Sequence, residues 1–323
     1  MLPVTFDDVL DAAARLEGQA VVTPLLEDPF LNERAGGRLL VKAEPLQRTG
    51  SFKFRGAFNR ISTVAEPSVV AFSSGNHAQG VALAARLLGK TATIIMPSDA
   101  PRIKQENTRA YGAGLRTYDR YHEVREAIGE DISRETGAVL VKPYDDPHVI
   151  AGQGTVGLEM ARQARDLGVE PDAAIVCAGG GGLTAGCAIA LTHAFPDIAV
   201  HTSEPAGYDD HRRSLESGHR EKVDGSAHSI CDALLAPMPG ELTFAINSRL
   251  VRSGYAVSDD EVRMAMRLAF DRLKVVVEPG GAVALAAALS GRHDCRGRVT
   301  LVVLSGGNVD PDLYRTCLVE QSC

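Results

Sequence analysis

The chain has no tryptophan, no apolar run of membrane-spanning length and no cluster of basic residues. The lack of tryptophan excludes no function. A membrane-spanning helix needs about 20 consecutive apolar residues, so the sequence predicts a protein without one. The 41 acidic residues outnumber the 34 lysines and arginines, which gives a net charge of −7. A mildly acidic chain without a basic cluster argues against nucleic acid as the main partner.

Cysteine patterns typical of metal or redox sites are also missing. None of the six cysteines forms a Cys-x-x-Cys pair or a zinc spacing. Cys177 ends a predicted buried strand and Cys187 lies in a predicted helix, so we interpret both as small packing residues. Residues 1–8 show neither the basic region nor the apolar region of a secretory signal. We therefore expect a cytoplasmic protein with reduced cysteines.

Short apolar runs alternate with helical patterns along most of the chain. Thr5 is predicted to cap a helix that ends at Gly18, and Ser258 to Glu261 form a capping box before another helix. Apolar strands that alternate with helices indicate parallel sheets covered on both faces. Two series of strands indicate an α/β protein with two domains. The expected strands span residues 39–42, 69–72, 91–96, 115–118, 139–141, 173–177, 198–202 and 299–304. Further helices are expected from about residue 77, after residue 101, at residues 123–136, near residue 155 and from residue 183.

A lysine between two aromatic residues is the first candidate for catalysis. In the segment Ser51–Gly56, Lys53 lies between Phe52 and Phe54. Aromatic neighbours desolvate the ammonium group, which lowers its pKa and frees the amine to attack an aldehyde. A lysine that holds pyridoxal phosphate (PLP) as a Schiff base has this chemistry. Most lysines are solvated and have no such role, so the argument depends on the motifs downstream.

Two predicted turns between a strand and a helix are suited to bind anions. Successive glycines let backbone N–H groups converge on an anion, and a helix N-terminus adds a favourable dipole. The first turn, which suits a phosphate, consists of Gly179, Gly180, Gly181 and Gly182. It is neither a dinucleotide fingerprint nor a Walker loop, and its structural alternative is a flexible turn. The second turn, which suits the α-carboxylate of a substrate, consists of Ser73, Ser74, Gly75, Asn76 and His77.

Together with residues 305–308 (Ser-Gly-Gly-Asn), these motifs resemble the serine/threonine dehydratase and serine racemase family, the fold-type II PLP enzymes. The resemblance covers about residues 23–310. It implies two parallel-sheet α/β domains, as in enzymes similar to the tryptophan synthase β-subunit. Residues 68–143 are expected to form a small substrate-binding domain, and residues 1–67 and 144–323 a large PLP-binding domain. A homodimer is expected as well.

The resemblance implies a role for each motif residue. Lys53 is expected to hold PLP and, once the substrate displaces it, to take the α-proton. Ser74 is expected to act as acid and base on the opposite face, as in serine racemase; alternatively it caps a helix or binds the carboxylate. His77 is expected to have a structural role. The remaining cofactor contacts are Phe52 on the pyridine ring, Asn76 at the 3′-oxygen, the glycine run at the phosphate, Ser305 at the pyridine nitrogen, and Glu278.

Phe52 and Glu278 each have a structural alternative. Phe52 can serve only in core packing. Glu278 precedes a predicted helix, where a carboxylate is favourable without any catalytic role.

A metal site and an effector site also follow from the resemblance. Serine racemase binds a divalent cation in the loop that corresponds to residues 203–210. The ligands would be the carboxylates of Glu204 and Asp210 and the carbonyl of Tyr208. Oxygen ligands suit Mg²⁺, with Ca²⁺ or Mn²⁺ as alternatives; the structural alternative is a solvated acidic loop. Positions that bind ATP as an effector in relatives correspond to Gln79, Tyr111 and Asn308.

The implied reaction is α,β-elimination from a small β-hydroxy amino acid, which gives a 2-oxo acid and ammonia. L-Serine, L-threonine and 3-hydroxyaspartate all remain open as substrates. The last needs a cation for its second carboxylate, and Arg125 is the candidate; alternatively it is a surface arginine. Racemisation by Lys53 and Ser74 stays open, although residues 238–241 (Met-Pro-Gly-Glu) depart from the serine-rich stretch of serine racemase. A β-replacement transferase is a more distant alternative, because its usual Ser-x-Lys-Asp-Arg motif is absent.

Overall fold

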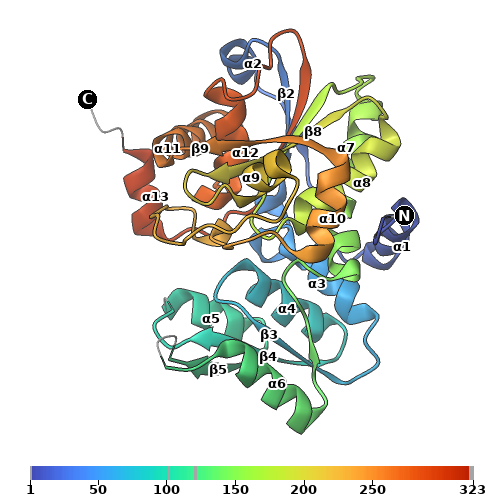
Figure 1. Ribbon diagram of the computed structural model, residues 1–323, viewed down its shortest axis with the longest axis vertical. Helices are drawn as coiled ribbons and strands as arrows, with labels where there is room; N and C mark the ends of the chain where they lie inside the picture. Colours follow the sequence, from blue (N-terminus) through green and yellow to red (C-terminus); the bar gives the residue numbers. More distant parts are fainter. Residues whose placement is uncertain (1, 101, 120–121, 320–323) are drawn as a thin grey trace.

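The computed structural model describes residues 2–100, 102–119 and 122–319, with only the backbone described at residues 103, 125 and 126. Within these ranges the strands form a six-stranded sheet and a four-stranded sheet. In Figure 1 the six-stranded sheet lies in the upper part, the four-stranded sheet in the lower part, and α3 (Lys53–Ser62) between them. No helix in the described ranges is long and apolar enough to cross a membrane.

The six-stranded sheet has the order β1-β2-β10-β7-β8-β9. All neighbouring strands are parallel except the antiparallel pair of β1 and β2. The central strand β7 is buried at every residue, as expected for a parallel sheet with helices on both faces. The strands are β1 Leu25–Leu26, β2 Arg38–Ala43, β7 Ala173–Cys177, β8 Ala199–Pro205, β9 Val251–Val257 and β10 Val299–Leu304. The helices around this sheet are α1 Phe6–Leu16, α2 Pro29–Ala35, α7 Pro147–Asp166, α8 Gly182–Ala194, α9 Asp210–Ser217, α10 Glu241–Leu250, α11 Asp259–Leu268, α12 Pro279–Leu289 and α13 Pro311–Leu318.

The four-stranded sheet has the order β5-β4-β3-β6, and all its neighbouring strands are parallel. Its strands are β3 Ser68–Phe72, β4 Thr91–Pro97, β5 Gly114–Tyr118 and β6 Val139–Leu140. Its helices are α4 Asn76–Leu87, α5 Arg102–Ala110 and α6 Arg125–Thr136. The hydrophobic core under this sheet also takes in Leu16, Phe54 and Phe58, which come from α1 and α3. Helix α3 therefore packs against α4, a helix of the four-stranded sheet, although it precedes that sheet in the chain.

The predicted helix ends are largely confirmed. Thr5 and Ser258 cap their helices, each in a capping box with the residue three positions later. The C-cap of α1 is Glu17 rather than Gly18, and Gly18 follows in the left-handed region with φ 71°. Helix α7 begins directly after its N-cap Asp146, earlier than expected, because Asp146 accepts hydrogen bonds from two backbone N–H groups of the first turn.

A buried group of four charges holds α3 in place. Arg55 donates from Nε to Glu44 Oε2 at 2.8 Å and from Nη1 to Glu159 Oε1 at 2.7 Å. Lys42 Nζ donates to Glu159 Oε2 at 2.6 Å and to the carbonyl of Thr23 at 2.7 Å. Buried charges are tolerated when they are paired and hydrogen-bonded. This group connects α3 to β2 and α7. Its member Arg55 lies two residues after Lys53 in the chain.

Candidate active site

A cavity of about 800 Å³ lies where the carboxyl ends of strands from both sheets meet. The turn after β3, the glycine run after β7 and Ser305 after β10 all line it, together with Lys53. Sites at the carboxyl ends of parallel strands are the rule in open α/β sheets. The four motifs recognised in the sequence thus meet in one cavity.

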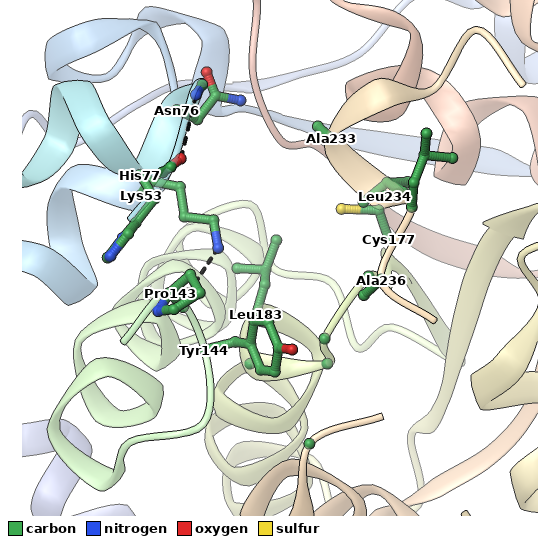
Figure 2. Close-up of a pocket in the computed structure, with 18 of the residues that line it drawn as sticks. Lys53, Asn76, His77, Pro143, Tyr144, Cys177, Leu183, Ala233, Leu234 and Ala236 are labelled. Atoms are coloured by element: carbon green, nitrogen blue, oxygen red, sulfur yellow. Dashed lines mark hydrogen bonds between the residues drawn. The ribbon is translucent and has the colours of Figure 1, made fainter. Parts of the chain in front are cut away.

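Lys53 is the first residue of α3, and its amine lies inside this cavity. Nζ donates a hydrogen bond to the carbonyl of Pro143 at 2.7 Å, and Figure 2 shows the side chain pointing into the space between Tyr144, Leu183 and Cys177. Burial lowers the pKa of Lys53 to about 8, although Cys177 and Glu278 oppose the fall. The fraction of neutral amine near neutral pH is therefore far larger than for an ordinary lysine, which favours its use as a nucleophile or base.

The two flanking rings contribute unequally to this environment. Phe52 lines the cavity, and its ring centre lies 5.1 Å from Lys53 Nζ. Phe54 points away into the core under the four-stranded sheet, where its ring packs 5.6 Å from that of Phe58. Desolvation of the lysine therefore comes from the walls of the cavity as a whole rather than from two rings.

The glycine run joins β7 to α8, with Gly181 as the N-cap at φ 90°. A Cβ at Gly180 would overlap the ring of Tyr144, and one at Gly181 would overlap His211. The absent side chains therefore let Tyr144 and His211 pack against the loop. The first N–H groups of a helix have no partner within the helix, so those of α8 are suited to bind an anion in the cavity that the glycine run lines. Two residues of α10 hold the carbonyls of this loop: Thr243 Oγ1 donates to Gly180 O at 2.7 Å and Asn247 Nδ2 to Gly181 O at 3.3 Å.

The turn after β3 has the geometry expected of a helix N-terminus. Gly75 is the N-cap of α4, and Gly75 N donates to Ser73 Oγ at 3.2 Å. Ser73 and Ser74 both line the cavity. His77 Nε2 lies 2.9 Å from the carbonyl of Val141, and burial lowers the pKa of His77 to about 3. The ring is therefore neutral near physiological pH.

Asn76 links the two sides of the cavity. Its Nδ2 donates to Glu278 Oε1 at 2.5 Å, and its Oδ1 accepts from Asn308 Nδ2 at 2.7 Å. Glu278 is the N-cap of α12, and burial raises its pKa to about 7 although the Asn76 hydrogen bond opposes the rise. Ser305 lies nearby, since its carbonyl accepts from Phe52 N at 3.1 Å. These residues surround the space next to Lys53.

Cys177 lines the cavity, a position that the sequence did not predict. It packs in the core as expected, but it also lines the cavity and interacts with Ser305. Burial raises the pKa of Cys177 to about 11, so the thiol stays protonated. The described cysteines are all free and buried.

The loop at residues 203–210, the proposed metal site, contains a buried carboxylate without a hydrogen-bond partner. Glu204 accepts hydrogen bonds from the backbone N–H groups of His211 and Arg212 at 2.8 Å each. Asp210 is fully buried and neither of its carboxylate oxygens has a hydrogen-bond partner. The Tyr208 hydroxyl donates to Gly225 O at 3.2 Å. Among the described residues, no three His, Cys, Asp or Glu side chains are arranged to hold a metal, so a cation here would depend on two carboxylates and a carbonyl.

The residues expected at an ATP site, and the arginine expected to bind a second carboxylate, are only partly found at the cavity. Gln79 and Asn308 line the cavity, whereas Tyr111 packs against the core under the four-stranded sheet. Arg125 begins α6, and its side chain lies outside the described residues. A different cation, Lys104, does line the cavity.

Comparison with known proteins identifies the family. Residues 16–306 match the family model described as pyridoxal-phosphate dependent enzyme. The chain belongs to this family. The L-threo-3-hydroxyaspartate ammonia-lyase of a Pseudomonas species is 43% identical to this PLP-dependent enzyme over 97% of this chain and 98% of the relative. The enzyme of the same name from Saccharomyces cerevisiae is 41% identical over 98% and 97%.

Solved structures agree with this assignment. The crystallised threonine deaminase from T.th. is 43% identical, with a TM-score of 0.89 over 95% of this chain and 99% of that one. Maize serine racemase is 37% identical, with a TM-score of 0.91 over 97% and 96%. The expected fold class and the resemblance to the dehydratase and racemase family are confirmed.

Proposed function

We propose that this PLP-dependent enzyme is an ammonia-lyase that converts L-threo-3-hydroxyaspartate to oxaloacetate and ammonia. The observation that carries the proposal is the convergence of Lys53, the turn at residues 73–77 and the glycine run on one cavity. Two relatives that are 43% and 41% identical over nearly their full length bear the name of this activity, which supports the choice of substrate. L-Serine and L-threonine are the alternative substrates of the same elimination.

The cavity residues fit PLP. We propose that Lys53 holds the aldehyde carbon, the glycine run binds the phosphate, and Ser305 bonds the ring nitrogen, with Phe52 and Asn76 beside the ring. The glycine run lines the cavity at the N-terminus of α8, and this position and the lowered pKa of Lys53 support the fit. When bound, PLP supplies a sink for the electrons that remain once the α-proton has left.

The protein's own residues then position the substrate and move the proton. The N-terminus of α4, with Ser73 and Ser74, binds the α-carboxylate through backbone N–H groups and the helix dipole. The neutral amine of Lys53 takes the α-proton, and the ammonium that results returns a proton to the β-hydroxyl, which leaves as water. Desolvation of the Lys53 amine inside the cavity keeps its pKa near the working pH, where a base is most effective.

Product release from a substrate panel tests this function. Ammonia and 2-oxo acid are measured with L-threo- and erythro-3-hydroxyaspartate, L-serine, D-serine and L-threonine, in wild type and in Lys53→Ala. We expect the largest kcat/KM with L-threo-3-hydroxyaspartate and no product from Lys53→Ala. A larger kcat/KM with serine or threonine would make the protein a general dehydratase, and product from Lys53→Ala would contradict the assignment of the lysine.

Racemisation is the second candidate activity, because Ser74 lines the same cavity as Lys53. Two acid–base groups on opposite faces allow a proton to leave one face and return on the other. Conversion of L-serine to D-serine by wild type, lost in Ser74→Ala while ammonia release continues, would support this activity. Racemisation at the full rate in Ser74→Ala would exclude Ser74 as the second base.

Further assignments complete the proposal. We propose that Glu204, Asp210 and the carbonyl of Tyr208 bind Mg²⁺, because the oxygens of the buried Asp210 carboxylate otherwise lack a hydrogen-bond partner. Residues 68–143 are proposed as the small domain, since β3 to β6 all fall within them. A homodimer, ATP as an effector and a cytoplasmic location remain expectations from the sequence, and the free, buried cysteines suit the reducing cytoplasm.

A further inference from the structure

An ion pair joins the two sides of the cavity near its opening. Lys104 Nζ, on α5 beside the four-stranded sheet, donates to Asp232 Oδ2 at 2.6 Å. Asp232 begins a short 3₁₀ helix, Asp232–Leu234, in the long segment between α9 and α10. Both residues line the cavity that contains Lys53. The pair therefore borders the space where the substrate is proposed to bind.

The topology places Lys104 beside the turn that is proposed to bind the α-carboxylate. That turn follows β3, and α5 follows the neighbouring strand β4. Because the strands are parallel, their carboxyl ends meet at the same edge of the sheet. Both charges also act on Glu278, another residue that lines the cavity. Lys104 lowers the pKa of Glu278 and Asp232 raises it. A second cation thus lies beside the proposed amino-acid site, separate from the turn that is proposed to bind the α-carboxylate.

The other cations that line the cavity are less suitable for binding a second carboxylate. Lys53 is committed to the cofactor and the α-proton. Lys142 is exposed to solvent. Arg220 is held at the rim by the carbonyl of Pro239, at 2.9 Å, and by Glu241, at 3.1 Å. Among the described cations of the cavity, Lys104 is therefore the best placed, because its side chain is bound only by the exposed carboxylate of Asp232, whereas Arg220 is bound by a backbone carbonyl as well.

We propose that Lys104 binds the distal carboxylate of a dicarboxylic amino acid, and that Asp232 occupies this position until such a substrate arrives. The proposal rests on the proposed function. The side chain of Asp232 is 59% exposed, so it can turn into solvent at little cost when the substrate carboxylate replaces it. A substrate without a distal carboxylate leaves the pair intact. Lys104 thereby favours hydroxyaspartate over serine without excluding serine from the cavity.

Binding of L-aspartate and L-alanine to the PLP-loaded protein tests this role. The two ligands differ only in the distal carboxylate, and neither has a β-hydroxyl to eliminate. The absorption spectrum of the bound cofactor reports their binding, so the readout does not depend on the lyase reaction. The variants are Lys104→Met, which keeps the length of the side chain, Asp232→Asn, and Lys142→Met as the matched lysine of the same cavity.

We expect Lys104→Met to raise the Kd of L-aspartate about 100-fold, which is typical of one lost charge-assisted hydrogen bond. The Kd of L-alanine should change by less than about threefold, and Lys142→Met should leave both Kd values nearly unchanged, because exposed charges interact weakly in water. Asp232→Asn should lower the Kd of L-aspartate, because it removes the competing carboxylate.

Equal weakening of both ligands in Lys104→Met would show that the pair only joins the two sides of the cavity, and would overturn the proposal. A selective loss of L-aspartate binding in Lys142→Met instead would overturn it as well. If wild type binds L-aspartate through Lys104 but does not release oxaloacetate from hydroxyaspartate, the proposed function fails while the assignment of Lys104 holds.

Discussion

Replacement of Arg55 by methionine is expected to destabilise the protein strongly. The Arg55 side chain is 1% exposed and its partner Glu44 is 0% exposed. Methionine retains much of the apolar stem of arginine but removes the charge and its hydrogen bonds. Glu44 and Glu159 would then have only Lys42 to balance them, so the buried group would carry a net negative charge.

The magnitude follows from the burial of these charges. Removal of one partner of a buried ion pair costs about 3–5 kcal/mol, because the remaining charge stays desolvated. The exposed pair of Arg315 and Asp312, whose side chains are 77% and 90% exposed, provides the control. Loss of such a pair costs about 0–1 kcal/mol, so Arg315→Met should be nearly neutral.

The effect should also depend on pH. Arg55 holds the pKa of Glu44 below its usual value, against the desolvation that raises it. In wild type this stabilisation is present above the unfolded pKa of glutamate and is lost as pH falls through the folded pKa. In Arg55→Met only Lys42 and the Thr23 hydrogen bond still oppose the desolvation, so the folded pKa of Glu44 rises and the carboxyl group takes up a proton more readily. The difference in stability between wild type and variant should therefore be largest near about pH 8 and smaller near about pH 5.

Urea unfolding followed by far-ultraviolet circular dichroism measures this difference, with PLP present throughout. We expect the free energy of unfolding to fall by about 3–5 kcal/mol in Arg55→Met and by less than about 1 kcal/mol in Arg315→Met. Glu44→Gln in the Arg55→Met background should restore part of the loss. A loss below about 1 kcal/mol in Arg55→Met, or a loss that grows towards acid pH, would refute the reasoning.

Three further predictions concern the cavity and the metal loop. Gly181→Ala should weaken PLP binding more than about 10-fold in an absorbance titration, because alanine is strained at φ 90° and its Cβ overlaps His211. The control Gly218→Ala is also strained, at φ 75°, but its Cβ lies in open space, so PLP binding should stay unchanged. The kcat should rise as pH increases through about 8, where Lys53 becomes neutral. Glu278→Gln should move this rise to lower pH, because the carboxylate raises the pKa of Lys53. An unchanged pH profile would contradict the role of Lys53 as the base. A chelator of divalent cations should lower the thermal unfolding midpoint of wild type but not of Asp210→Asn, and equal shifts would contradict the metal site.

The sequence predicted those parts of the fold that local pattern determines. Uniformly apolar runs such as Ala173–Cys177 became central parallel strands, because both faces of such a sheet are covered. Strand β9 was missed because only its two ends are buried and it contains Gly254, so it shows neither an apolar run nor an alternating pattern. Helix α3 was missed because its periodicity is divided between two surroundings, with Phe54 in a hydrophobic core and Arg55 in the buried charge group.

Site residues were found from the sequence where several neighbours act together in one turn. The glycine run and the turn at residues 73–77 carry their chemistry in consecutive backbone groups, so their pattern is visible in the chain. Thr243 and Asn247, which hold the glycine loop, lie more than 60 residues away from it, and Lys104 meets Asp232 across 128 positions of sequence separation. Such contacts depend on how α10 and α5 pack, and no local pattern encodes them.

The assignment of Lys53 as the PLP lysine is tested most directly by reduction of the PLP-loaded protein with borohydride. Reduction fixes the bond between the cofactor and its lysine, and mass spectrometry of the digested protein then locates the modified residue. We expect the modification on the peptide that contains Lys53, and none in Lys53→Ala. The assignment of Lys53 would be contradicted if the modification lay instead on Lys42, Lys104 or Lys142. It would also be contradicted if the Lys53→Ala protein were modified to the same extent as wild type.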